Sequence, residues 1–367
     1  MQFRGSEKVL VLQTSFLGDT LLTLPLLSEI KRRFPRVKLT LVCNSAAGEL
    51  LQDHPGIDEI IVDDKSGADK GWTGLWRKAK QLRSKGFDIA LSPHKSLRSA
   101  LLLFLAAVPH RVGFRQSKGW FLFHERVNRN ATRHDAERNL SVLQACGINP
   151  EDCHRDLTLP VNDAARESVA RLLRSLNVDL NKLIVGVNPG SVWPTKRWTA
   201  EGFAGLIARI RRQFDCEVLL FGGPDDLDIN SRIAQQCDGG TVNLAGKLSL
   251  RELAAAISFC RVFVTNDSGP MHVAVACQVP TVAIFCATTP GLGFYPYSSK
   301  AVVVEKLLGC RPCGSHGGRR CPLGTEDCIR LIQPEDVFKA VERLLDGGED
   351  NRASTGKNRY EPEFITV

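Results

Sequence analysis

The chain has 367 residues, of which 43% are hydrophobic and 24% charged, a composition typical of a soluble globular protein with room for two domains. No stretch approaches the roughly 20 consecutive apolar residues that a membrane-spanning helix needs. The opening residues MQFRGSEKVL lack the apolar core and cleavage site of a secretory signal, so the protein is expected to stay in the cytoplasm.

The net charge of +8 is unevenly distributed along the chain. Residues 1–150 contain 23 Lys and Arg against 14 Asp and Glu, a net charge of +9, whereas residues 151–367 contain 25 against 26. The excess either lies on solvated helix faces or holds an anionic partner. An acidic membrane surface, a phosphorylated saccharide and nucleic acid are the candidates for that partner.

The first half alternates short β-rich runs with helical stretches. Near-continuous apolar strands that are separated by helices predict a parallel sheet covered on both faces. We predict strands at 8–14, 37–43, 59–64, 87–93 and 110–114, and helices near 20–34, 45–53, 72–85 and 96–107.

The segment 149–181 contains two prolines and a helical stretch at 163–176, and we place a linker there. The N-terminal domain is expected to span residues 1–165 and the C-terminal domain residues 178–346. The remaining residues, 347–367, are polar and rich in glycine near their start, so this tail is expected to be disordered.

The second half repeats the alternation of short strands and helices seen in the first. Thr199 and Ser249 are good N-caps for the helices that follow them. Strands are predicted at 183–189, 217–223, 241–245, 261–267, 280–286 and 301–305. We therefore predict an α/β protein with two Rossmann-like, doubly wound domains that face each other across a cleft. The first turn, TSFLGD, holds one glycine and no GxGxxG, which disfavours a dehydrogenase.

In a doubly wound sheet, ligands bind beyond the carboxyl ends of the first and fourth strands, where the winding reverses. The loops at those switch points are 14–19 and 92–98 in the first half. In the second half they are 188–198 and 266–272. All four carry polar or charged residues directly after an apolar strand, which makes them the candidate ligand loops.

The loop NDSGPMH (266–272) leads from a predicted strand into a helix. Asp267 and Ser268 can cap that helix, and Gly269 lets a ligand approach the backbone. The first amides and the positive end of the helix dipole suit a phosphate group. Lys196, in the paired loop, can neutralise a diphosphate. The alternative is an ordinary capped helix.

Asp19 lies just after the first strand, at a helix N-terminus. It is either a simple N-cap or a carboxylate that takes a proton from an attacking hydroxyl. Lys95 and Arg98, after the fourth strand, either hold an anionic acceptor or begin a solvated helix. Asp226, in the loop GGPDD, either accepts hydrogen bonds from a ribose or caps the next helix.

Four of the 12 cysteines cluster near the C-terminus, while the other eight are scattered, several in apolar runs that read as buried positions. The cluster is Cys310, Cys313, Cys321 and Cys328, with the spacing C-x2-C-x7-C-x6-C. One CxxC and two further thiols can supply a structural zinc or iron–sulfur site. Free or locally paired thiols are the alternative.

The motifs together resemble glycosyltransferase family nine, the ADP-heptose:lipopolysaccharide heptosyltransferases, and most closely the heptosyltransferase II branch. The matching pieces cover roughly residues 8–345 in family order. They are VLVLQTSFLGDTLLTLPLL, HKSLRSALLLFLAAVPHRVGF, NPGSVWPTKRW, the FGGPDD loop, NDSGPMHVAVACQVPTVAIF, FYP at 294–296 and the cysteine segment.

The resemblance implies a GT-B fold whose N-terminal domain takes the acceptor and whose C-terminal domain takes the nucleotide sugar. It implies that Asp19 is the general base of an inverting transfer that requires no metal or other cofactor. It implies that Lys196 and the turn with Asp267, Ser268, Gly269 and His272 hold the diphosphate and sugar of the donor. Ser191 and Asp226, on the adjoining loops, are further donor-binding candidates. The acceptor-binding candidates are Ser15, Lys95 and Arg98.

The implied partners are ADP-heptose and the heptosylated inner core on Kdo-lipid A, met at the cytoplasmic face of the inner membrane by peripheral contact. A nucleotide-sugar hydrolase or epimerase on the same fold, or transfer of another sugar within the family, is the alternative reading. Nucleic acid is not an expected partner, because no basic stretch is interleaved with aromatic residues.

Overall fold

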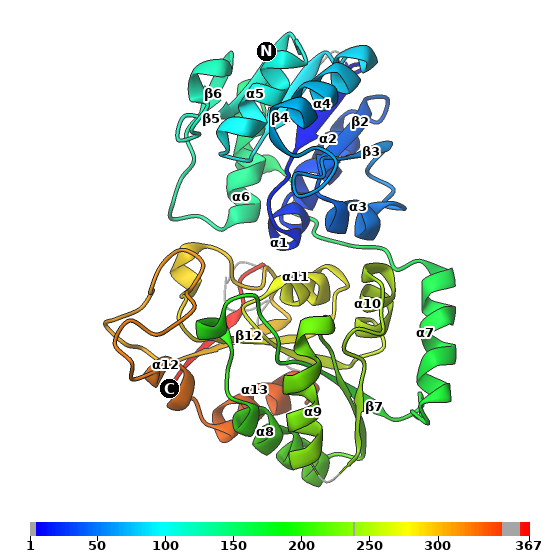
Figure 1. The fold of residues 1–367 in the computed structure, drawn as a ribbon, viewed down its shortest axis with the longest axis vertical. Coiled ribbons are helices and arrows are strands. Elements are labelled where there is room, and N and C mark those ends of the chain that lie inside the picture. The colour runs from blue at the N-terminus through cyan, green and yellow to red at the C-terminus, as the bar shows by residue number, and fades with distance from the viewer. Residues whose placement is uncertain (1–4, 238, 347–359) are drawn as a thin grey trace. The chain divides into compact units, whose positions relative to one another are not determined.

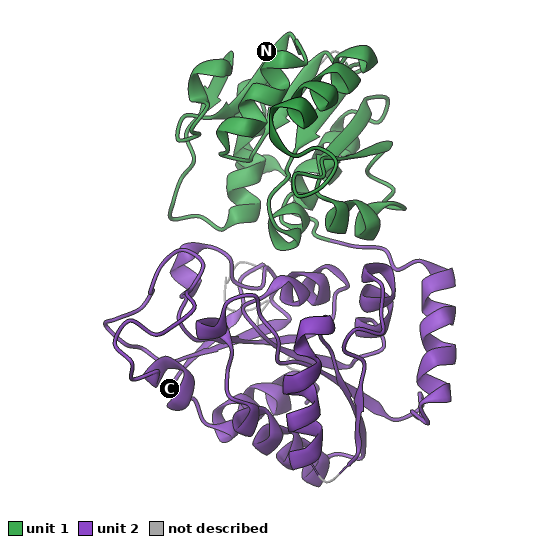
Figure 2. Ribbon diagram, viewed as in Figure 1, with its two compact units in different colours: residues 1–157 green, residues 158–367 purple. Residues whose placement is uncertain are grey.

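The computed structural model describes residues 5–237, 239–346 and 360–367 (Figure 1). The chain divides into two compact units, residues 1–157 and 158–367 (Figure 2). The first unit is shorter than the predicted domain of residues 1–165. Helix α7 (Asp163–Ser175) belongs to the second unit, because Ser168 on it donates a 2.9 Å hydrogen bond to Glu252 on helix α10 (Leu250–Ile257).

The first unit contains a six-stranded parallel sheet in the order β3-β2-β1-β4-β5-β6. The strands are β1 (Lys8–Leu12), β2 (Lys38–Cys43), β3 (Glu59–Val62), β4 (Ile89–Ser92), β5 (His110–Phe114) and β6 (Glu125–Val127). The helices are α1 (Leu17–Leu21), α2 (Leu24–Arg33), α3 (Ser45–Leu51), α4 (Gly71–Lys85), α5 (Leu97–Leu105) and α6 (Asp135–Leu140), with the 3-10 turns η1 (Trp120–Leu122), η2 (Ser141–Cys146) and η3 (Pro150–Asp152).

The second unit contains a seven-stranded parallel sheet in the order β13-β12-β11-β10-β7-β8-β9. Its strands are β7 (Leu183–Asn188), β8 (Cys216–Leu220), β9 (Thr241–Asn243), β10 (Val262–Asn266), β11 (Thr281–Phe285), β12 (Ala301–Glu305) and β13 (Glu363–Thr366). Besides α7 and α10, its helices are α8 (Ala200–Gln213), α9 (Leu227–Gln236), α11 (Gly269–Ala276), α12 (Asp327–Arg330) and α13 (Pro334–Leu345), with the turns η4 (Pro194–Lys196), η5 (Pro224–Asp226) and η6 (Pro290–Leu292).

The two switch points lie where the sequence places them. In the first sheet β1 pairs with β4, and Val9 lies opposite Ile89. In the second sheet β7 pairs with β10, and Val187 lies opposite Val264. The winding reverses between these strands in each sheet, so the prediction of two doubly wound domains is confirmed. Every predicted strand is present, with ends that differ by no more than a few residues.

Two strands were not predicted. β6 has two exposed residues and one buried, and it pairs with the edge of the first sheet through β5. β13 adds to β12 and lies in the tail that was expected to be disordered, so that expectation is wrong for Glu363–Thr366. Residues 347–359 of the tail lie outside the described part of the chain.

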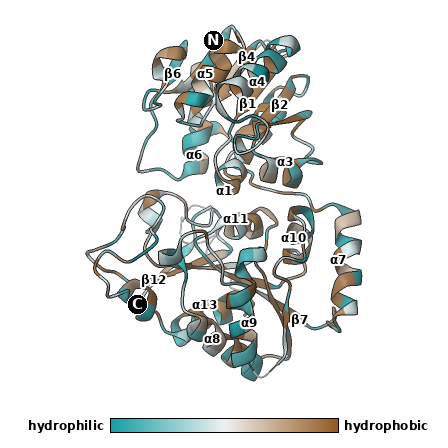
Figure 3. Cartoon of the chain, viewed as in Figure 1, coloured by the Kyte–Doolittle hydropathy of each residue, from teal (hydrophilic) through white to brown (hydrophobic). Residues whose placement is uncertain are grey.

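Each sheet packs its apolar side chains against its own helices, and Figure 3 shows the strands largely in the brown of apolar residues. In the first unit, Leu10, Leu12 and Ala90 of the sheet contact buried residues of α4 and α5, which therefore cover the same face. In the second unit, α8 and α13 supply the helical side of the core. Within the described residues, no helix is both long and apolar enough to cross a membrane.

Candidate active site

Two asparagines at the ends of neighbouring strands hold the switch-point loops of the second unit together. Asn266, at the end of β10, accepts a 3.0 Å hydrogen bond from the Trp198 amide and donates a 2.7 Å bond to the Pro189 carbonyl. Asn188, at the end of β7, donates to the Gly190 carbonyl at 3.2 Å. The loop 188–198 is thus fixed against the start of the loop 266–272.

Trp198 anchors the far end of the same loop. Its indole is fully buried and its N–H donates to the Ile332 carbonyl at 3.0 Å. The ring also packs edge-on against Phe203 of α8, with centroids 5.0 Å apart. A loop held by both its backbone and a buried tryptophan presents the side chains between its ends in a fixed arrangement.

Lys196 and Asp267, predicted as donor-binding residues from separate loops, form an ion pair. The Lys196 ammonium lies 2.6 Å from Asp267 Oδ2, and the two side chains are 13% and 9% exposed. The Thr288 hydroxyl donates to the same carboxylate oxygen at 2.7 Å. The site therefore holds a nearly buried positive charge whose position is set by a carboxylate.

The prediction that Asp267 and Ser268 cap α11 is wrong. Asp267 is engaged with Lys196 and Thr288, and Ser268 stands at the N-cap position without a capping side-chain bond. The Ser268 hydroxyl instead lies 3.2 Å from Thr265 Oγ1 and within 3.5 Å of Asn188. Its side chain is turned back towards the ends of β7 and β10, so neither Asp267 nor Ser268 caps the first turn of α11.

The first turn of α11 keeps the features that suit an anion. Gly269 begins the helix, Pro270 occupies a position where no amide is needed, and His272 lies buried one turn in. The positive end of the helix dipole at this point favours a negatively charged group. Lys196 supplies a full positive charge on the paired loop, so the two features together form a candidate diphosphate site.

Asp226 and Ser191 join this edge of the sheet from two other positions. The Asp226 carboxylate accepts from the Gly223 amide at 3.0 Å at the start of the turn η5, but it makes no capping bond to the next helix, α9, so the capping role that the sequence left open for that helix is wrong. It also lies against Gly190, where a Cβ would sit 2.4 Å from its Oδ2. Ser191 follows Gly190, and its carbonyl accepts from the Arg197 guanidinium at 2.7 Å. Asp226 thus lies beside the loop that carries Ser191 and Lys196.

The cysteine segment packs behind the Lys196 loop, a relation that the sequence did not reveal. The Thr195 hydroxyl donates to the Gly318 carbonyl at 2.9 Å, and the Gly318 amide lies 2.7 Å from the same hydroxyl. A Cβ at Gly317 would sit 2.9 Å from Cγ of Lys196. The close approach requires glycine there, and the segment limits where the lysine stem can go.

Arg311 connects the cysteine segment to the ion pair. Its guanidinium is almost completely buried and pairs with Glu305 at 3.0 Å. It donates to the Phe285 carbonyl at 2.8 Å and to the Thr288 carbonyl at 2.5 Å. Because Thr288 bonds Asp267, Arg311 holds the residue that orients the carboxylate beside Lys196. No sequence motif marks Arg311 for this role.

The four late cysteines differ in exposure. Cys310 is exposed, Cys313 and Cys321 are half-buried, and Cys328 is buried, all as free thiols. Over the residues that the structure describes, no group of three or more His, Cys, Asp or Glu side chains is arranged to hold a metal ion. The structural metal site at these cysteines stays a prediction.

In the first unit, Asp19 lies in the first turn of α1. Its carboxylate accepts a 3.2 Å hydrogen bond from the Phe16 amide, so it does cap its own helix. Its side chain is half-buried and not enclosed. Capping does not exclude catalysis, because a carboxylate has two oxygens with several lone pairs between them. The catalytic role of Asp19 stays a prediction.

A hollow of about 520 Å³ lies beside Asp19's loop, at the carboxyl edge of the first sheet. Its lining includes Ser15, a predicted acceptor-binding residue, but not Asp19, Lys95 or Arg98. The lining residues are Thr14, Ser15, Phe16, Leu17, Asn44, Ser45, Ala46, Asp63, Asp64, Lys65, Ser66 and His94. They come from the ends of β1, β2, β3 and β4, which is where a doubly wound sheet binds its ligand.

Two basic residues of the hollow were not singled out from the sequence. The Lys65 ammonium bonds the Thr14 carbonyl. His94 Nδ1 lies 2.8 Å from the Ser99 hydroxyl and 3.3 Å from the Thr14 hydroxyl. Burial, reinforced by Lys65 and Lys95, lowers the pKa of His94 to about 4, so its ring is neutral near pH 7. Lys65 lies three residues beyond the end of β3 and His94 two residues beyond the end of β4, positions that mark them as candidates.

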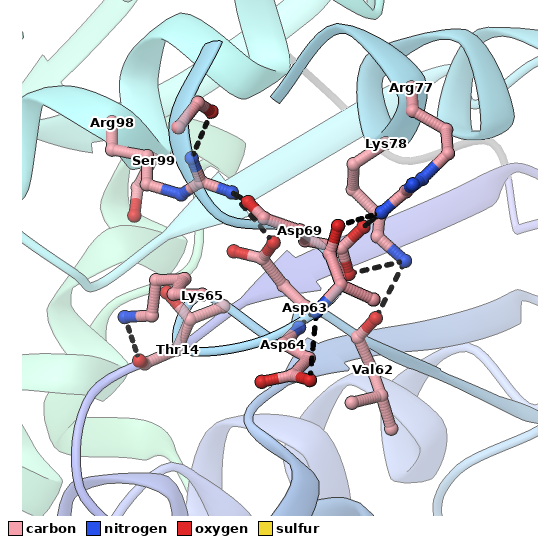
Figure 4. Close-up of polar contacts among 12 residues, drawn as sticks. Thr14, Val62, Asp63, Asp64, Lys65, Asp69, Arg77, Lys78, Arg98 and Ser99 are labelled. Atoms are coloured by element: carbon pink, nitrogen blue, oxygen red, sulfur yellow. Dashed lines mark hydrogen bonds and ion pairs between the residues drawn. The ribbon is translucent and has the colours of Figure 1, made fainter. Parts of the chain in front are cut away.

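Arg98 does not extend into solvent. Its guanidinium bonds Asp63 at 2.9 Å and the Asp69 carbonyl at 2.8 Å, as Figure 4 shows. Asp69 in turn pairs with Arg77 at 2.9 Å and Lys78 at 3.2 Å. These bonds fix the loop between β3 and α4, which forms one wall of the hollow. The structure thus gives Arg98 a partner within the protein, and its acceptor-binding role stays a prediction.

Lys95 is exposed and lies within electrostatic reach of Asp19. Partial desolvation and the neighbouring Arg129 and Arg138 lower its pKa, while Asp135 and Asp19 oppose that shift. Nearby positive charges disfavour the charged form of a lysine, and an anion bound beside it offsets that effect. Lys95 is therefore better placed than Arg98 to meet an anionic ligand near Asp19.

Comparison with known proteins identifies the family. Residues 75–321, about two-thirds of the chain, match glycosyltransferase family 9 (heptosyltransferase). A lipopolysaccharide heptosyltransferase 2 of Escherichia coli strain K12 is 28% identical over 348 residues, which cover 92% of this chain and 98% of the relative.

Two solved structures show the same fold over nearly the whole chain. One is the glycosyl transferase family 9 protein of Veillonella parvula, 28% identical with a TM-score of 0.85, covering 94% of this chain and 98% of that one. The other is E. coli ADP-heptose lps heptosyltransferase II, 25% identical with a TM-score of 0.75, covering 93% and 99%. A transferase family that matches most of the chain does not favour the hydrolase or epimerase that the sequence left open. The chain therefore belongs to glycosyltransferase family 9, the heptosyltransferases.

Proposed function

We propose that the protein transfers L-glycero-D-manno-heptose from ADP-heptose to the lipopolysaccharide inner core, adding the second heptose to the first. The observation that carries the proposal is the Lys196–Asp267 pair beside a helix start that makes no side-chain capping bond, in a chain that belongs to a heptosyltransferase family. The names of its relatives, lipopolysaccharide heptosyltransferase 2 and ADP-heptose lps heptosyltransferase II, support the choice of donor and step.

The second unit binds the donor in this proposal. The diphosphate of ADP-heptose meets Lys196 and the first turn of α11 at Ser268, Gly269 and His272. As the bond between the sugar and the diphosphate breaks, negative charge grows on the departing phosphate. A nearly buried ammonium and a helix N-terminus stabilise that charge more strongly than water does, because they are already oriented. Asp226 and Ser191, on the adjoining loops, contact the nucleoside in this proposal.

The first unit binds the acceptor and supplies the base. Asp19 takes the proton of the acceptor hydroxyl as its oxygen attacks the anomeric carbon, which inverts the configuration there. The hollow beside Ser15 receives the saccharide, and Lys95 and Lys65 offset its phosphates and carboxylates. The neutral ring of His94 and the amide of Asn44 offer hydrogen-bonding groups to sugar hydroxyls.

We propose further that transfer needs no metal ion, because Lys196 and α11 provide the positive charge that a metal would provide. Initial rates should be the same with and without a chelator such as EDTA. A rate that falls in EDTA and returns with added Mg²⁺ would contradict this part of the proposal. The acceptor carries lipid A, so we place the reaction at the cytoplasmic face of the inner membrane.

One experiment tests the donor, the acceptor and the reaction class together. The purified protein is given ADP-heptose with Kdo-lipid A that carries no heptose, one heptose or two. We expect ADP release and a mass gain of one heptose only with the singly heptosylated acceptor. Release of ADP without acceptor would indicate a hydrolase. Transfer to the heptose-free acceptor would mean that the protein adds the first heptose instead. Transfer to none of the three acceptors would reject heptosyl transfer to the inner core.

A further inference from the structure

The outer face of α4 is unusual for a surface helix because two tryptophans point into solvent. Trp72 is 68% exposed and Trp76 is 59% exposed. They lie one turn apart, so they share one side of the helix, and Lys80 and Arg83 continue that side at the following turns. The opposite side, with Leu75, Ala79 and Leu82, fills the core. The exposed tryptophans therefore do not belong to the folding core.

The neighbouring elements carry more exposed apolar side chains. On α5, Leu97 is 40% exposed and Phe104 is 48% exposed, and on η1, Trp120 and Phe121 are 47% and 60% exposed. α5 lies beside α4 on the same face of the sheet, and Figure 3 draws most of it in brown.

Turn η1 lies directly against α5. A Cβ at Gly119 would sit 2.4 Å from the Ala100 methyl and 3.4 Å from Leu97. The exposed side chains of α4, α5 and η1, together with Arg111 of β5, Lys118 before η1 and Arg126 of β6, thus form one surface, which we call the aromatic–basic face. Its residues are Trp72, Trp76, Lys80, Arg83, Leu97, Phe104, Arg111, Lys118, Trp120, Phe121 and Arg126.

The chain segment that carries this face is mainly basic. Residues 71–126 contain eleven Lys and Arg against two acidic residues, Asp88 and Glu125. Four of the eleven pair with carboxylates from outside the segment, namely Arg77, Lys78, Lys85 and Arg98. The Arg126 guanidinium lies 5.2 Å from the Trp120 ring, and Arg111 lies 5.4 Å from the Phe104 ring. Among the residues that the structure describes, Lys80, Arg83, Lys118 and Arg126 have no ion-pair partner. Their charges are available to an external anion.

From this pattern we propose that the aromatic–basic face docks the protein on an anionic phospholipid bilayer. Tryptophan favours the interface between hydrocarbon and water, because its ring is apolar and its N–H is polar. Lysine and arginine beside such rings are attracted to anionic headgroups. A protein interface also favours tryptophan, phenylalanine and arginine, but it disfavours lysine, which this face carries at Lys80 and Lys118 and which an anionic bilayer attracts.

The position of the face relative to the candidate acceptor site explains why docking would help the reaction, an argument that rests on the proposed function. α5 begins at Leu97, two residues after Lys95, so the face adjoins the carboxyl edge of the first sheet where the 520 Å³ hollow lies. A saccharide whose lipid anchor stays in the bilayer is then presented to Ser15 and Lys95 without leaving the membrane. Because the docked protein and the acceptor both diffuse in the plane of the membrane, the protein finds the acceptor in less time.

Vesicle binding of the full-length protein tests the proposal without any substrate. Vesicles of phosphatidylethanolamine with phosphatidylglycerol are compared with vesicles of phosphatidylcholine alone by sedimentation. We expect binding to the anionic vesicles that weakens at high salt, and little binding to the neutral ones. Tryptophan fluorescence should shift to the blue on binding, because Trp72, Trp76 and Trp120 leave water.

Matched variants separate the two components of the face. Trp72→Ser/Trp76→Ser should reduce the partition coefficient by roughly tenfold or more through lost apolar burial. Lys80→Glu/Arg83→Glu should reduce it by a similar factor and abolish the dependence on anionic lipid. Leu307→Ser and Arg174→Glu, which alter exposed residues of the second unit, should bind as the wild type does. Circular dichroism checks that each variant is folded.

Several outcomes would overturn the proposal. Equal binding of all variants, or equal binding to neutral and anionic vesicles, would remove the face from docking. Self-association that disappears in Trp72→Ser/Trp76→Ser, without vesicle binding by the wild type, would assign the face to contact between copies of the chain. Phosphatidylglycerol carries no saccharide and no lipid A phosphates. Binding of the protein to vesicles that contain it therefore reports recognition of anionic phospholipid headgroups alone.

Failure of the docking and failure of the proposed function give different results. With a deacylated, water-soluble acceptor, the face variants should transfer heptose at the wild-type rate, because none of the mutated residues touches the candidate site. Absence of transfer with every acceptor would reject the proposed function and leave the vesicle result standing. Normal transfer together with unaltered vesicle binding in all variants would reject the docking alone.

Discussion

The two sheets share one strand order around their switch points, but the loops at those points are held very differently. In the second unit, Asn266 and the buried Trp198 fix the loop that carries Lys196, and Asp267 fixes the lysine itself. In the first unit, the corresponding loops leave a hollow of about 520 Å³, with Asp19 only half-buried at its helix start.

The contrast follows from what each edge has to bind in the proposed reaction. A nucleoside diphosphate is the same molecule in every turnover, so a fixed charge and a fixed helix end suit it. A branched saccharide on a lipid is larger and more variable, and a hollow lined by hydroxyls, amides and two basic residues adapts to it. If this comparison is right, substitutions at the site of the first unit lower the rate of heptosyl transfer, whereas substitutions at the site of the second unit lower the affinity for the donor.

The largest expected effect is that of Asp19→Asn. The heptosyl transfer rate should fall by about a hundredfold to ten-thousandfold, because asparagine cannot take the proton. Asparagine keeps an acceptor for the Phe16 amide, so α1 should remain capped. ADP affinity by calorimetry should be unchanged. Asp152→Asn, an exposed carboxylate in the same unit, is the control and should transfer normally. Near-normal transfer by Asp19→Asn would exclude Asp19 as the base.

The next effect concerns the stability of the second unit. Arg311→Ala should lower the free energy of unfolding by about 3 kcal/mol, because it leaves Glu305 unpaired and several carbonyls without a donor. Arg330→Ala removes an exposed guanidinium that pairs with Glu326 and should cost about 0.5 kcal/mol or less. Urea unfolding measures both. Equal stability of the two variants would show that Arg311 does not organise this region.

Lys196→Ala should follow, with a loss of about 2 kcal/mol in ADP binding, or roughly thirtyfold in Kd. Part of the loss arises because Asp267, left without its partner, repels the diphosphate. The double variant Lys196→Ala/Asp267→Asn should therefore recover some affinity. Lys182→Ala removes an exposed lysine paired with Asp215 and should bind ADP normally. An unchanged Kd in Lys196→Ala would mean that the diphosphate binds elsewhere.

Most of the fold is predictable from the sequence because central parallel strands are buried on both faces and read as unbroken apolar runs. β6 and β13 are the exceptions. Their residues are largely exposed or polar, and only the neighbouring strand that each pairs with makes them strands. A single sequence shows no sign of that partner, which lies elsewhere in the chain.

The candidate site is predictable to the level of loops but not of bonds. Strand ends and fold rules bring Lys196 to Asp267, yet nothing in the sequence says that they pair with each other. Ser268 has the residue type of a cap, but its rotamer points to Thr265. Arg98 reads as a solvated basic residue because its partner, Asp63, lies 35 positions earlier in the chain.

The smallest predicted effect is the pH dependence that His94 gives to the first unit. Its pKa is about 4 in the folded protein, below the ordinary value of 6.5. As the pH falls below 6.5, the unfolded chain takes up a proton that the folded protein refuses until about pH 4. Stability is therefore lost as the pH falls from about 7 towards 4, by about 1 to 2 kcal/mol at pH 5.

His94→Gln removes that titration, so its stability should decline less than that of the wild type between pH 7 and 5. Ser99→Ala, which deletes a hydrogen-bond partner of the ring but leaves the ring buried, should lower stability at every pH and keep the wild-type slope. Urea unfolding at several pH values distinguishes the two. Parallel curves for His94→Gln and the wild type would mean that the ring accepts its proton as readily in the folded chain as in the unfolded one. Water would then reach the His94 ring more freely than its burial in the lining of the hollow indicates. The two switch points would in that case differ in solvent access as well as in how their loops are anchored.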